Sequence, residues 1–391
     1  MTISADIFCK VIDNFGDLGV CWRLARQLHH EHGISVTLWV DDMATFARMD
    51  AGIDATLATQ MRGGIRVCLW RDEIEYPEPG NLVIEGFGCP LPLNFLQAMT
   101  VLPQVPVWLN LEYLSAEDWV EGCHGLTSPH PQTGLSQHFW FPGFTSQTGG
   151  LLREQMLLST REEFQSDTGL QQAFWTRIGV PDALQAGCRF SLFAYENSAI
   201  SGLLDTLADL NETSLVVVPK GRALADVERW AGRKGLQPGD RVVQGALTVA
   251  VLPFLSHDDY DRLLWACDIN AVRGEDSFVR AQWAARPLLW HIYPQDEDAH
   301  WVKLEAFLAE MGGVVPVPAV WSEVMRAWNR GAASDKLWRD LLANMPALTA
   351  AAGSWSRHLA IQPDLATSVM RFYASQVEYR PLNPYIGTGN A

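Results

Sequence analysis

The sequence predicts an α/β protein built from two Rossmann-like domains that face each other across a cleft. The chain has 391 residues, which is too long for one ordinary hydrophobic core, so two domains are expected. Short runs of Val, Ile and Leu alternate with stretches of helical periodicity in both halves of the chain. This alternation indicates parallel sheets that helices cover on both faces.

The first half begins with a short apolar strand, a polar loop that contains glycine, and a helix. The helix is predicted over 19–30, where Val20, Leu24 and Leu28 recur at helical spacing. Other apolar runs of four to eight residues predict further strands. The strands expected in this half are 6–12, 36–40, 65–70, 81–87 and 106–111.

A long stretch without periodicity separates the two halves. Residues 122–150 are rich in Gly, Pro, Ser, Thr and Gln and are expected to form a loop, which is usually functional or a linker. We therefore assign the first domain to 1–150, a linker region with a polar helix to 151–185, and the second domain to 186–350. The C-terminal segment 351–391 begins as a helix and is expected to pack back on the first domain.

The second half repeats the same rhythm. Two doubly wound domains that face a cleft are the arrangement of GT-B glycosyltransferases, and of some other nucleotide-dependent enzymes. The strands expected here are 189–195, 214–219, 246–254, 269–272 and 288–292. The helices expected here are 200–210, 223–234, 258–266, 277–285 and 297–311.

Composition excludes several classes of function. The formal net charge of -16 argues against general nucleic-acid binding, because the chain repels phosphates and has no Lys/Arg-rich run. The seven cysteines are scattered without a CxxC pair, so neither a disulfide framework nor a zinc site is predicted. The N-terminus lacks the apolar stretch of a signal peptide, and no apolar run is long enough to span a bilayer. We expect a cytoplasmic protein that binds no membrane.

The segment DNFGDLGVCWRLARQL connects the first predicted strand to the first helix, at the edge where open parallel sheets bind ligands. It is not GxGxxG, which disfavours a nicotinamide-dependent dehydrogenase. Asp13 at the strand end and Asp17 near the helix N-terminus are candidate acids, and the helix dipole keeps a carboxylate there ionised. An N-cap role for Asp17 and a turn role for Asp13 are the alternatives. The residues between them are assigned to substrate binding: Asn14, Phe15 and Gly16.

A second motif, NAVRGEDSFVRAQWA, follows a predicted strand and begins a helix in the second domain. Ser277 or Asp276 can cap this helix, whose free N–H groups form an anion site suited to a diphosphate. Arg273 adds positive charge, or pairs with a nearby acid. The acids Glu275 and Asp276 suit a ribose or sugar hydroxyl better than a phosphate. A capped helix with no ligand is the alternative.

Aromatic residues follow two further strands. Phe193 and Tyr195 lie at one predicted strand end, and Phe254 lies at another. At a ligand cleft they can enclose a nucleotide base, and Tyr195 can donate to a phosphate oxygen. Aromatic residues in strands more often belong to the core.

The sequence predicts neither a metal site nor a cofactor. No HExxH or comparable spacing of ligands is present, and His29, His30 and His32 read as a solvated helix end. The acidic pairs at 41–42 and 258–259 read as loop or helix-start features. No G-x-S-x-G segment supports acyl transfer.

Four segments resemble, in order, the bacterial EarP family of protein-arginine rhamnosyltransferases, which modify translation elongation factor P. They are DNFGDLGVCWRLARQL, FWFPGFTSQTGGLLRE, FAYEN and RGEDSFVRAQWA, and the resemblance extends from Asp6 to about Trp301. It implies a GT-B fold, a dTDP-β-L-rhamnose donor, and inversion at the anomeric carbon without a metal. It also implies an arginine in a loop of elongation factor P as the acceptor, and relief of ribosome stalling at proline runs as the outcome.

The resemblance also implies roles for single residues. The aspartate matching Asp17 is the general base of the family, and Asp13 lies beside it. The residues matching the donor site of the family are Tyr195, Glu275, Asp276 and Ser277, with Glu275 grouped among the catalytic residues. The residues matching Phe193 and Phe254 lie near the base of the nucleotide.

Arginine as an acceptor fits an acidic pair, because its guanidinium is protonated and a poor nucleophile. Two carboxylates can grip it, orient one nitrogen and accept a proton, although sequence does not decide between Asp13 and Asp17. Two other functions stay open: a GT-B transferase acting on a small carbohydrate, and a non-catalytic module that binds a nucleotide sugar.

Overall fold

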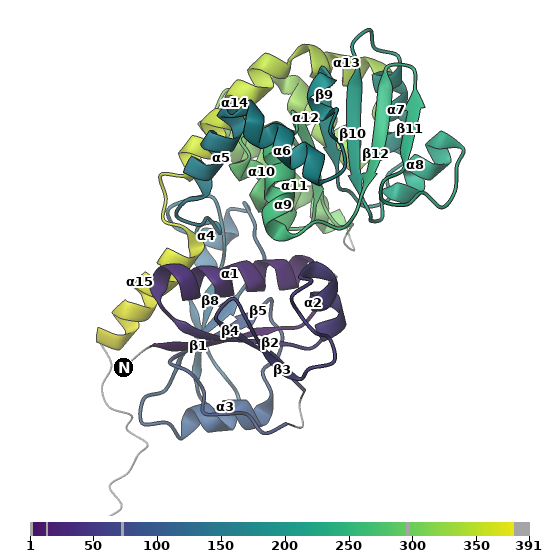
Figure 1. Ribbon diagram of the computed structural model, residues 1–391. Coiled ribbons are helices and arrows are strands. Elements are labelled where there is room, and N and C mark those ends of the chain that lie inside the picture. Colours follow the sequence, from purple (N-terminus) through teal and green to yellow (C-terminus); the bar gives the residue numbers. More distant parts are fainter. Residues whose placement is uncertain (1–2, 13–14, 72–73, 295–297, 379–391) are drawn as a thin grey trace, which may run out of the picture. The chain divides into compact units, whose positions relative to one another are not determined.

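The computed structural model describes residues 3–12, 15–71, 74–294 and 298–378, and it contains two compact units. The first unit comprises Met1–Gln155 and Gln362–Ala391, and the second comprises Met156–Ile361 (Figure 1). Each unit has its own sheet. In the described part of the chain, no helix combines the length and hydropathy that a membrane span requires.

The first unit contains an eight-stranded sheet of order β3-β4-β2-β1-β5-β6-β8-β7. Its inner strands are parallel, and the short edge strands β3 and β7 pair antiparallel with their neighbours. The strands are β1 (Ser4–Cys9), β2 (Ser35–Val40), β3 (Thr59–Arg62), β4 (Ile65–Leu69), β5 (Leu82–Gly86), β6 (Val107–Leu111), β7 (Thr127–Pro129) and β8 (Ser136–Trp140).

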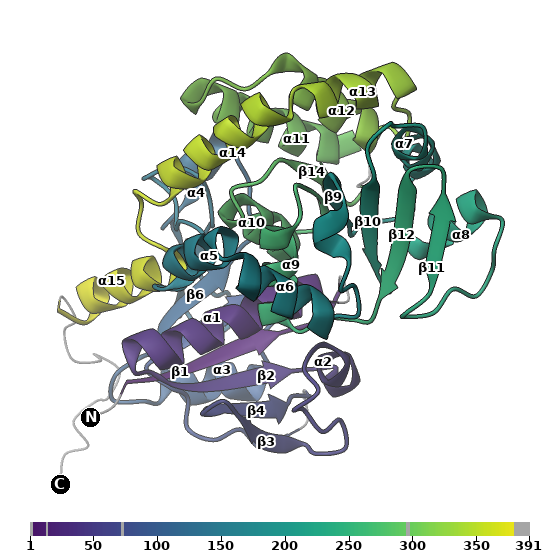
Figure 2. The ribbon, with the colours of Figure 1, turned by 45° about the horizontal axis from the view of Figure 1, so that its top comes forward.

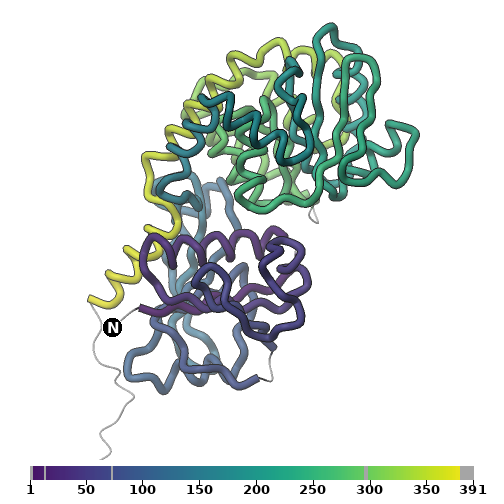
Figure 3. The backbone as a smooth tube through the Cα atoms, viewed as in Figure 1, coloured from purple at the N-terminus to yellow at the C-terminus, as the bar shows by residue number. Residues whose placement is uncertain are grey.

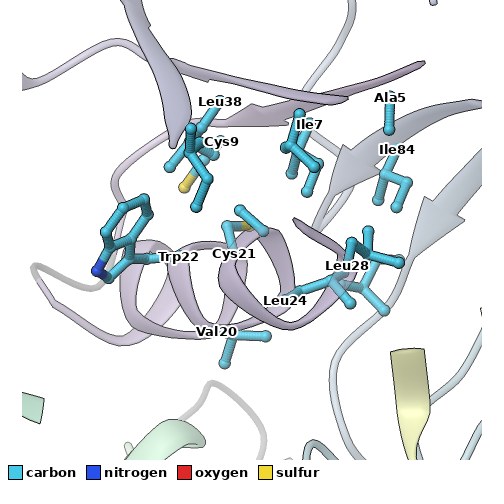
Figure 4. Packing of buried hydrophobic residues seen from close by; sticks show 14 of the residues in the cluster. Ala5, Ile7, Cys9, Val20, Cys21, Trp22, Leu24, Leu28, Leu38 and Ile84 are labelled. Carbon is cyan, nitrogen blue, oxygen red and sulfur yellow. The ribbon is translucent and has the colours of Figure 1, made fainter. Parts of the chain in front are cut away.

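Helices cover both faces of this sheet, with α1 on one face and α3 on the other (Figure 1). The helices of the unit are α1 (Gly16–His32), α2 (Met43–Met49), α3 (Leu93–Thr100), α4 (Trp119–Cys123) and α15 (Leu365–Glu378). The apolar stripe of α1 includes Leu24 and Leu28, and it packs on Ile7 and Ile84 of the central strands (Figure 4). Burial of this stripe fixes the position of α1, and therefore of the loop that precedes it.

The C-terminal helix α15 belongs to the first unit, although α14 before it belongs to the second. Its residues Leu365, Ala366, Val369 and Tyr373 are buried in the same core as α1. The side-chain amide of Gln27 on α1 donates to Asp364, just before α15, at 2.9 Å. Figure 3 shows this yellow segment beside the purple N-terminal helix.

The second unit contains a six-stranded sheet of order β11-β12-β10-β9-β13-β14, parallel except for the edge strand β11 (Figure 2). The strands are β9 (Cys188–Leu192), β10 (Ser214–Pro219), β11 (Arg241–Gln244), β12 (Leu247–Leu252), β13 (Ile269–Arg273) and β14 (Leu288–His291). The helices are α5 (Leu157–Ser166), α6 (Thr168–Arg177), η1 (Ala183–Gln185), α7 (Ala199–Ala208), α8 (Leu224–Ala231), α9 (His257–Ala266), α10 (Asp276–Trp283), α11 (Ala299–Val314), α12 (Ala319–Asn329), α13 (Asp335–Ala343) and α14 (Met345–Leu359).

Each apolar run that predicted a strand forms one, and the predicted alternation of strands and helices is confirmed. The expected loop at 122–150 is wrong in part, because it contains the paired strands β7 and β8. The edge strands β3 and β11 were also missed. These short strands carry mostly polar, partly exposed residues, so they lack the continuous apolar run that reveals a buried strand.

Candidate active site

Asp17 lies where the parallel strands of the first sheet have their carboxyl ends, the place where open α/β sheets bind ligands. It is in the first turn of α1 and is only 2% exposed. Its Oδ2 accepts a hydrogen bond from the backbone N–H of Ile12 at 3.1 Å. Its Oδ1 accepts one from the hydroxyl of Tyr113 at 3.3 Å. The N-cap of α1 is Phe15, with no side-chain cap bond, so the interpretation of Asp17 as an N-cap is wrong. The carboxylate instead connects the β1–α1 loop to the end of β6.

The other predicted residues of this loop are placed only in part. Asp13 and Asn14 lie outside the described residues. Gly16 is the first residue of α1. Phe15 is partly buried against the core, and the guanidinium carbon of Arg48 lies 5.7 Å from the centroid of its ring.

Two thiols lie beneath this loop, Cys9 at the end of β1 and Cys21 on α1, and both are buried. A hydrogen bond to Cys21 and burial raise the pKa of Cys9, and the nearby Asp17 acts in the same direction. Cys9 therefore stays protonated and neutral at physiological pH. The cysteines are free in the described residues; Cys123 and Cys188 are partly exposed and the others are buried.

A buried carboxyl group that the sequence analysis missed lies on β5 of the same sheet. Glu85 is 6% exposed, and its Oε2 accepts a hydrogen bond from the side-chain amide of Gln137 on β8 at 2.6 Å. Burial raises the pKa of Glu85 from 4.5 to about 7, and the nearby carboxylate of Glu112 adds to the increase. Glu85 lies within the apolar run NLVIEGF, and nothing in the sequence distinguishes it from a polar residue at the exposed end of a strand.

We expect the substitution Glu85→Gln to stabilise the first unit in a pH-dependent way. The pKa of Glu85 is higher in the folded state than its ordinary value of 4.5, so its contribution to stability is fully present below about pH 4.5 and is lost as the pH rises through about 7. Glutamine resembles the neutral acid and still accepts from Gln137. Urea unfolding should show the variant about 2 kcal/mol more stable than wild type near pH 8, and nearly equal below about pH 5.

The matched control is Glu121→Gln, because Glu121 is an exposed glutamate of the same unit. A Glu85→Gln variant whose stability follows that of wild type at every pH would contradict the assigned protonation of Glu85.

In the second unit, Arg273 at the end of β13 lies between two of the aromatic residues that the sequence analysis assigned to substrate binding. Its guanidinium carbon is 4.8 Å from the ring centroid of Phe193 and 4.7 Å from that of Tyr195. Its Nη1 has no hydrogen-bond partner among the residues that the structure describes. Strands β9 and β13 are adjacent, and this pairing brings the three side chains together. A cation fixed between two rings is suited to binding an anionic ligand.

The helix that follows Arg273 begins differently from the prediction. The N-cap of α10 is Glu275, without a side-chain cap bond, so the expected cap by Ser277 or Asp276 is wrong. The Ser277 hydroxyl instead donates to the carbonyl of Arg273 and accepts from its N–H. It thereby holds the turn between β13 and α10. Asp276 lies in the first turn of α10 and is half-buried.

Tyr195 has further neighbours that the sequence analysis did not single out. Its ring centroid lies 5.3 Å from that of His291 and 5.4 Å from that of Tyr293. The guanidinium of Arg222 lies 5.5 Å from the same ring and also pairs with Glu196. The signal that could have found His291 and Tyr293 is their position at the end of the predicted strand 288–292.

Burial and the charge of Arg273 lower the pKa of His291 to about 4, so its imidazole is neutral at physiological pH.

Phe254 follows β12 and is 37% exposed. The ring of Phe193 packs on Tyr260 of α9, at 5.5 Å between centroids. The aromatic residues expected near the base therefore lie at the carboxyl ends of β9 and β12 in one sheet.

The predicted catalytic residues belong to different units, with Asp17 in the first and Glu275 in the second. Among the described residues, no group of three or more His, Cys, Asp or Glu is arranged to hold a metal ion. Three of the four residues in the acidic pairs lie at helix starts: Asp42 caps α2, and Asp258 and Asp259 lie in the first turn of α9. Asp41 accepts a hydrogen bond from the N–H of Val11 at 2.9 Å.

Comparison with known proteins identifies relatives along almost the whole chain. The family model described as Elongation-Factor P (EF-P) rhamnosyltransferase EarP matches residues 5–374. A protein-arginine rhamnosyltransferase of Pseudomonas putida is 51% identical over 379 residues, which cover 96% of this chain and 100% of that protein. One of Neisseria meningitidis is 34% identical over 388 residues, which cover 96% and 98%.

Solved structures agree with this relationship. A structure described as the basis for EarP-mediated arginine glycosylation of translation elongation factor EF-P has a TM-score of 0.69 at 38% identity, covering 96% of this chain and 99% of that one. A UDP-glucosyltransferase from Polygonum tinctorium has a TM-score of 0.51 at 9% identity, covering 97% and 99%, and this likeness concerns the fold alone. The predicted GT-B glycosyltransferase fold is confirmed.

Proposed function

Since the chain belongs to the EarP family of rhamnosyltransferases, we propose that it transfers L-rhamnose from dTDP-β-L-rhamnose to an arginine side chain of translation elongation factor P, with inversion at the anomeric carbon. The observation that carries this proposal is the buried, doubly hydrogen-bonded carboxylate of Asp17 at the ligand edge of a GT-B first unit. The outcome of the modification would be relief of ribosome stalling at proline runs in the cytoplasm.

The second unit is proposed to bind the donor. Arg273 would contact the diphosphate, and the N–H groups at the start of α10 would bind its oxygens. Phe193 and Phe254 would contact the base, while Tyr195 would donate to a phosphate oxygen. Support comes from the position of these side chains at the carboxyl ends of β9, β12 and β13 in one sheet, where open α/β sheets bind ligands.

Glu275, Asp276 and Ser277 complete the proposed donor site. Ser277 would act through the backbone of Arg273, because its hydroxyl bonds both the N–H and the carbonyl of that residue. The two acids would hold sugar hydroxyls. These contacts would stabilise the departing diphosphate without a metal or a cofactor.

The first unit is proposed to bind the acceptor, with Asp17 as the general base and Asp13 as its partner in holding the guanidinium. As Asp17 takes a proton from one guanidinium nitrogen, that nitrogen attacks C1 of rhamnose. The bond between C1 and the diphosphate oxygen breaks, and dTDP departs with the electron pair. The product nitrogen belongs again to a cationic guanidinium, so charge and protons balance.

We expect Arg273→Ala to weaken binding of dTDP-rhamnose by about 10- to 100-fold, because charge-assisted hydrogen bonds to the diphosphate are lost. Arg273→Lys should give an intermediate affinity, since a point charge replaces the planar guanidinium. Isothermal titration calorimetry measures both. Arg233→Ala, which removes an exposed arginine of the same unit, is the control and should bind like wild type. Equal affinities of Arg273→Ala and wild type for dTDP-rhamnose would mean that Arg273 does not contact the donor.

Mass spectrometry tests the proposed function directly. Elongation factor P is incubated with the protein, dTDP-rhamnose and a chelator, and then analysed intact and as peptides. A single deoxyhexose on one arginine would support donor, acceptor and metal independence together. Transfer to a small carbohydrate but not to the protein would indicate a small-molecule transferase instead. Donor binding without turnover would indicate a binding module.

A further inference from the structure

Tyr113 contacts Asp17 from a different strand of the first sheet. It follows β6, and its hydroxyl donates to Oδ1 of Asp17 at 3.3 Å. The N–H of Ile12, after β1, donates to Oδ2 at 3.1 Å. Each carboxylate oxygen is thus held by a group from a different loop, which restricts rotation of the carboxylate about its bond to Cβ. The Tyr113 bond is long for O–H···O, and such bonds often shorten when substrate binds.

The ring of Tyr113 is itself held in place. It stacks on Phe87, with 4.5 Å between ring centroids and an angle of 22° between their planes. Phe87 directly follows β5 and adopts a φ of +57°, which is unfavourable for a bulky residue. Its N–H donates to the carbonyl of Leu111, the last residue of β6, at 2.6 Å. Backbone strain of this kind is retained where the surroundings fix it, and it occurs most often at functional sites.

The two side chains differ in exposure. Asp17 is 2% exposed, whereas Tyr113 is 39% exposed, so one face of its ring packs on Phe87 while part of the ring remains accessible. An accessible aromatic ring beside a buried carboxylate matches the shape and charge of an arginine side chain. The guanidinium plane can stack on the ring while its N–H groups reach the carboxylate.

We propose that Tyr113 positions Asp17 for proton transfer and that its ring binds the guanidinium of the acceptor arginine; this inference rests on the proposed function. The hydroxyl donates to the ionised carboxylate, stabilises that form and fixes its orientation. The ring contributes to binding of the acceptor but not of the donor. The two contributions are separable, because phenylalanine removes only the hydroxyl.

Steady-state kinetics of transfer to elongation factor P test the hydroxyl through Tyr113→Phe. We expect kcat to fall about 5- to 20-fold while KM for elongation factor P changes little, because the ring is kept. The acidic limb of the pH profile of kcat should move to higher pH, since the ionised carboxylate loses a donor. Tyr76→Phe is the matched control: it removes a hydroxyl that bonds the Arg71 carbonyl in the same unit, and it should behave like wild type.

Tyr113→Leu tests the ring. We expect the loss in kcat seen for Tyr113→Phe, together with a KM for elongation factor P raised about tenfold. Cooperative thermal unfolding and a wild-type affinity for dTDP-rhamnose, measured on the same samples, should establish that this variant is folded. A KM equal to that of Tyr113→Phe would overturn binding of the guanidinium by the ring.

The outcomes distinguish this inference from the proposed function. An active wild-type enzyme together with an unchanged kcat and pH profile for Tyr113→Phe overturns the positioning role alone. A wild-type protein that binds dTDP-rhamnose but does not modify elongation factor P overturns the proposed function, and the inference with it.

Discussion

The substitution Asp17→Asn is expected to lower the rate of rhamnosyl transfer by about 100- to 10,000-fold, the usual effect of removing a general base. Asparagine has nearly the same shape: its amide oxygen can accept from the N–H of Ile12 while its NH2 group donates to the Tyr113 hydroxyl oxygen, so the β1–α1 loop should keep its conformation. It cannot take a proton from the guanidinium. Affinity for dTDP-rhamnose should stay nearly unchanged, because the proposed donor site lies in the second unit.

Single-turnover transfer to elongation factor P, followed by mass spectrometry, measures the rate, and calorimetry measures donor binding. The charge-matched control is Asp54→Asn, since Asp54 is an exposed turn residue of the same unit and should be dispensable. The variant Asp13→Asn should be assayed in parallel. Near wild-type transfer by Asp17→Asn, with a large loss in Asp13→Asn, would assign the base to Asp13 instead.

The second large effect expected is on stability. Arg280 of α10 is 2% exposed and forms two hydrogen bonds to Asp261 of α9, Nε to Oδ1 at 3.0 Å and Nη2 to Oδ2 at 2.7 Å. The substitution Arg280→Met should destabilise the second unit by about 3–5 kcal/mol, because it leaves the buried carboxylate of Asp261 without this partner. Since α10 follows Arg273, a less stable α10 should also weaken donor binding.

Denaturant unfolding followed by circular dichroism measures the first effect, and calorimetry with dTDP-rhamnose measures the second. Lys336→Met is the control, because Lys336 is 84% exposed in its pair with Asp340, and such exposed pairs contribute little to stability. The double variant Arg280→Met with Asp261→Leu should recover part of the loss, since no buried charge remains. Equal losses of unfolding free energy in Arg280→Met and Lys336→Met would mean that the Arg280–Asp261 pair does not fix α10 in place.

The sequence by itself determined the fold class and the position of the motifs. Buried strands such as β5 and β10 are continuous apolar runs, and α1 has a helical stripe, so local patterns were sufficient. The rule that parallel sheets bind ligands at the carboxyl ends of their strands is sufficient to place Asp17, Arg273 and Tyr195 at such an end. The roles proposed for these residues come from the resemblance to a family.

Only the tertiary structure decided which side chains meet. Tyr113 and Asp17 are 96 residues apart, and they contact each other because β6 ends and α1 begins at the same edge of one sheet. Arg273 lies between Phe193 and Tyr195 because β13 pairs with β9, and strand order is not a local property of the sequence. The hydrogen bond that Glu85 accepts likewise comes from β8, a partly exposed strand that local periodicity did not reveal. Contacts between distant segments depend on how the whole sheet assembles, whereas the pattern within one strand or helix depends only on which of its faces is buried.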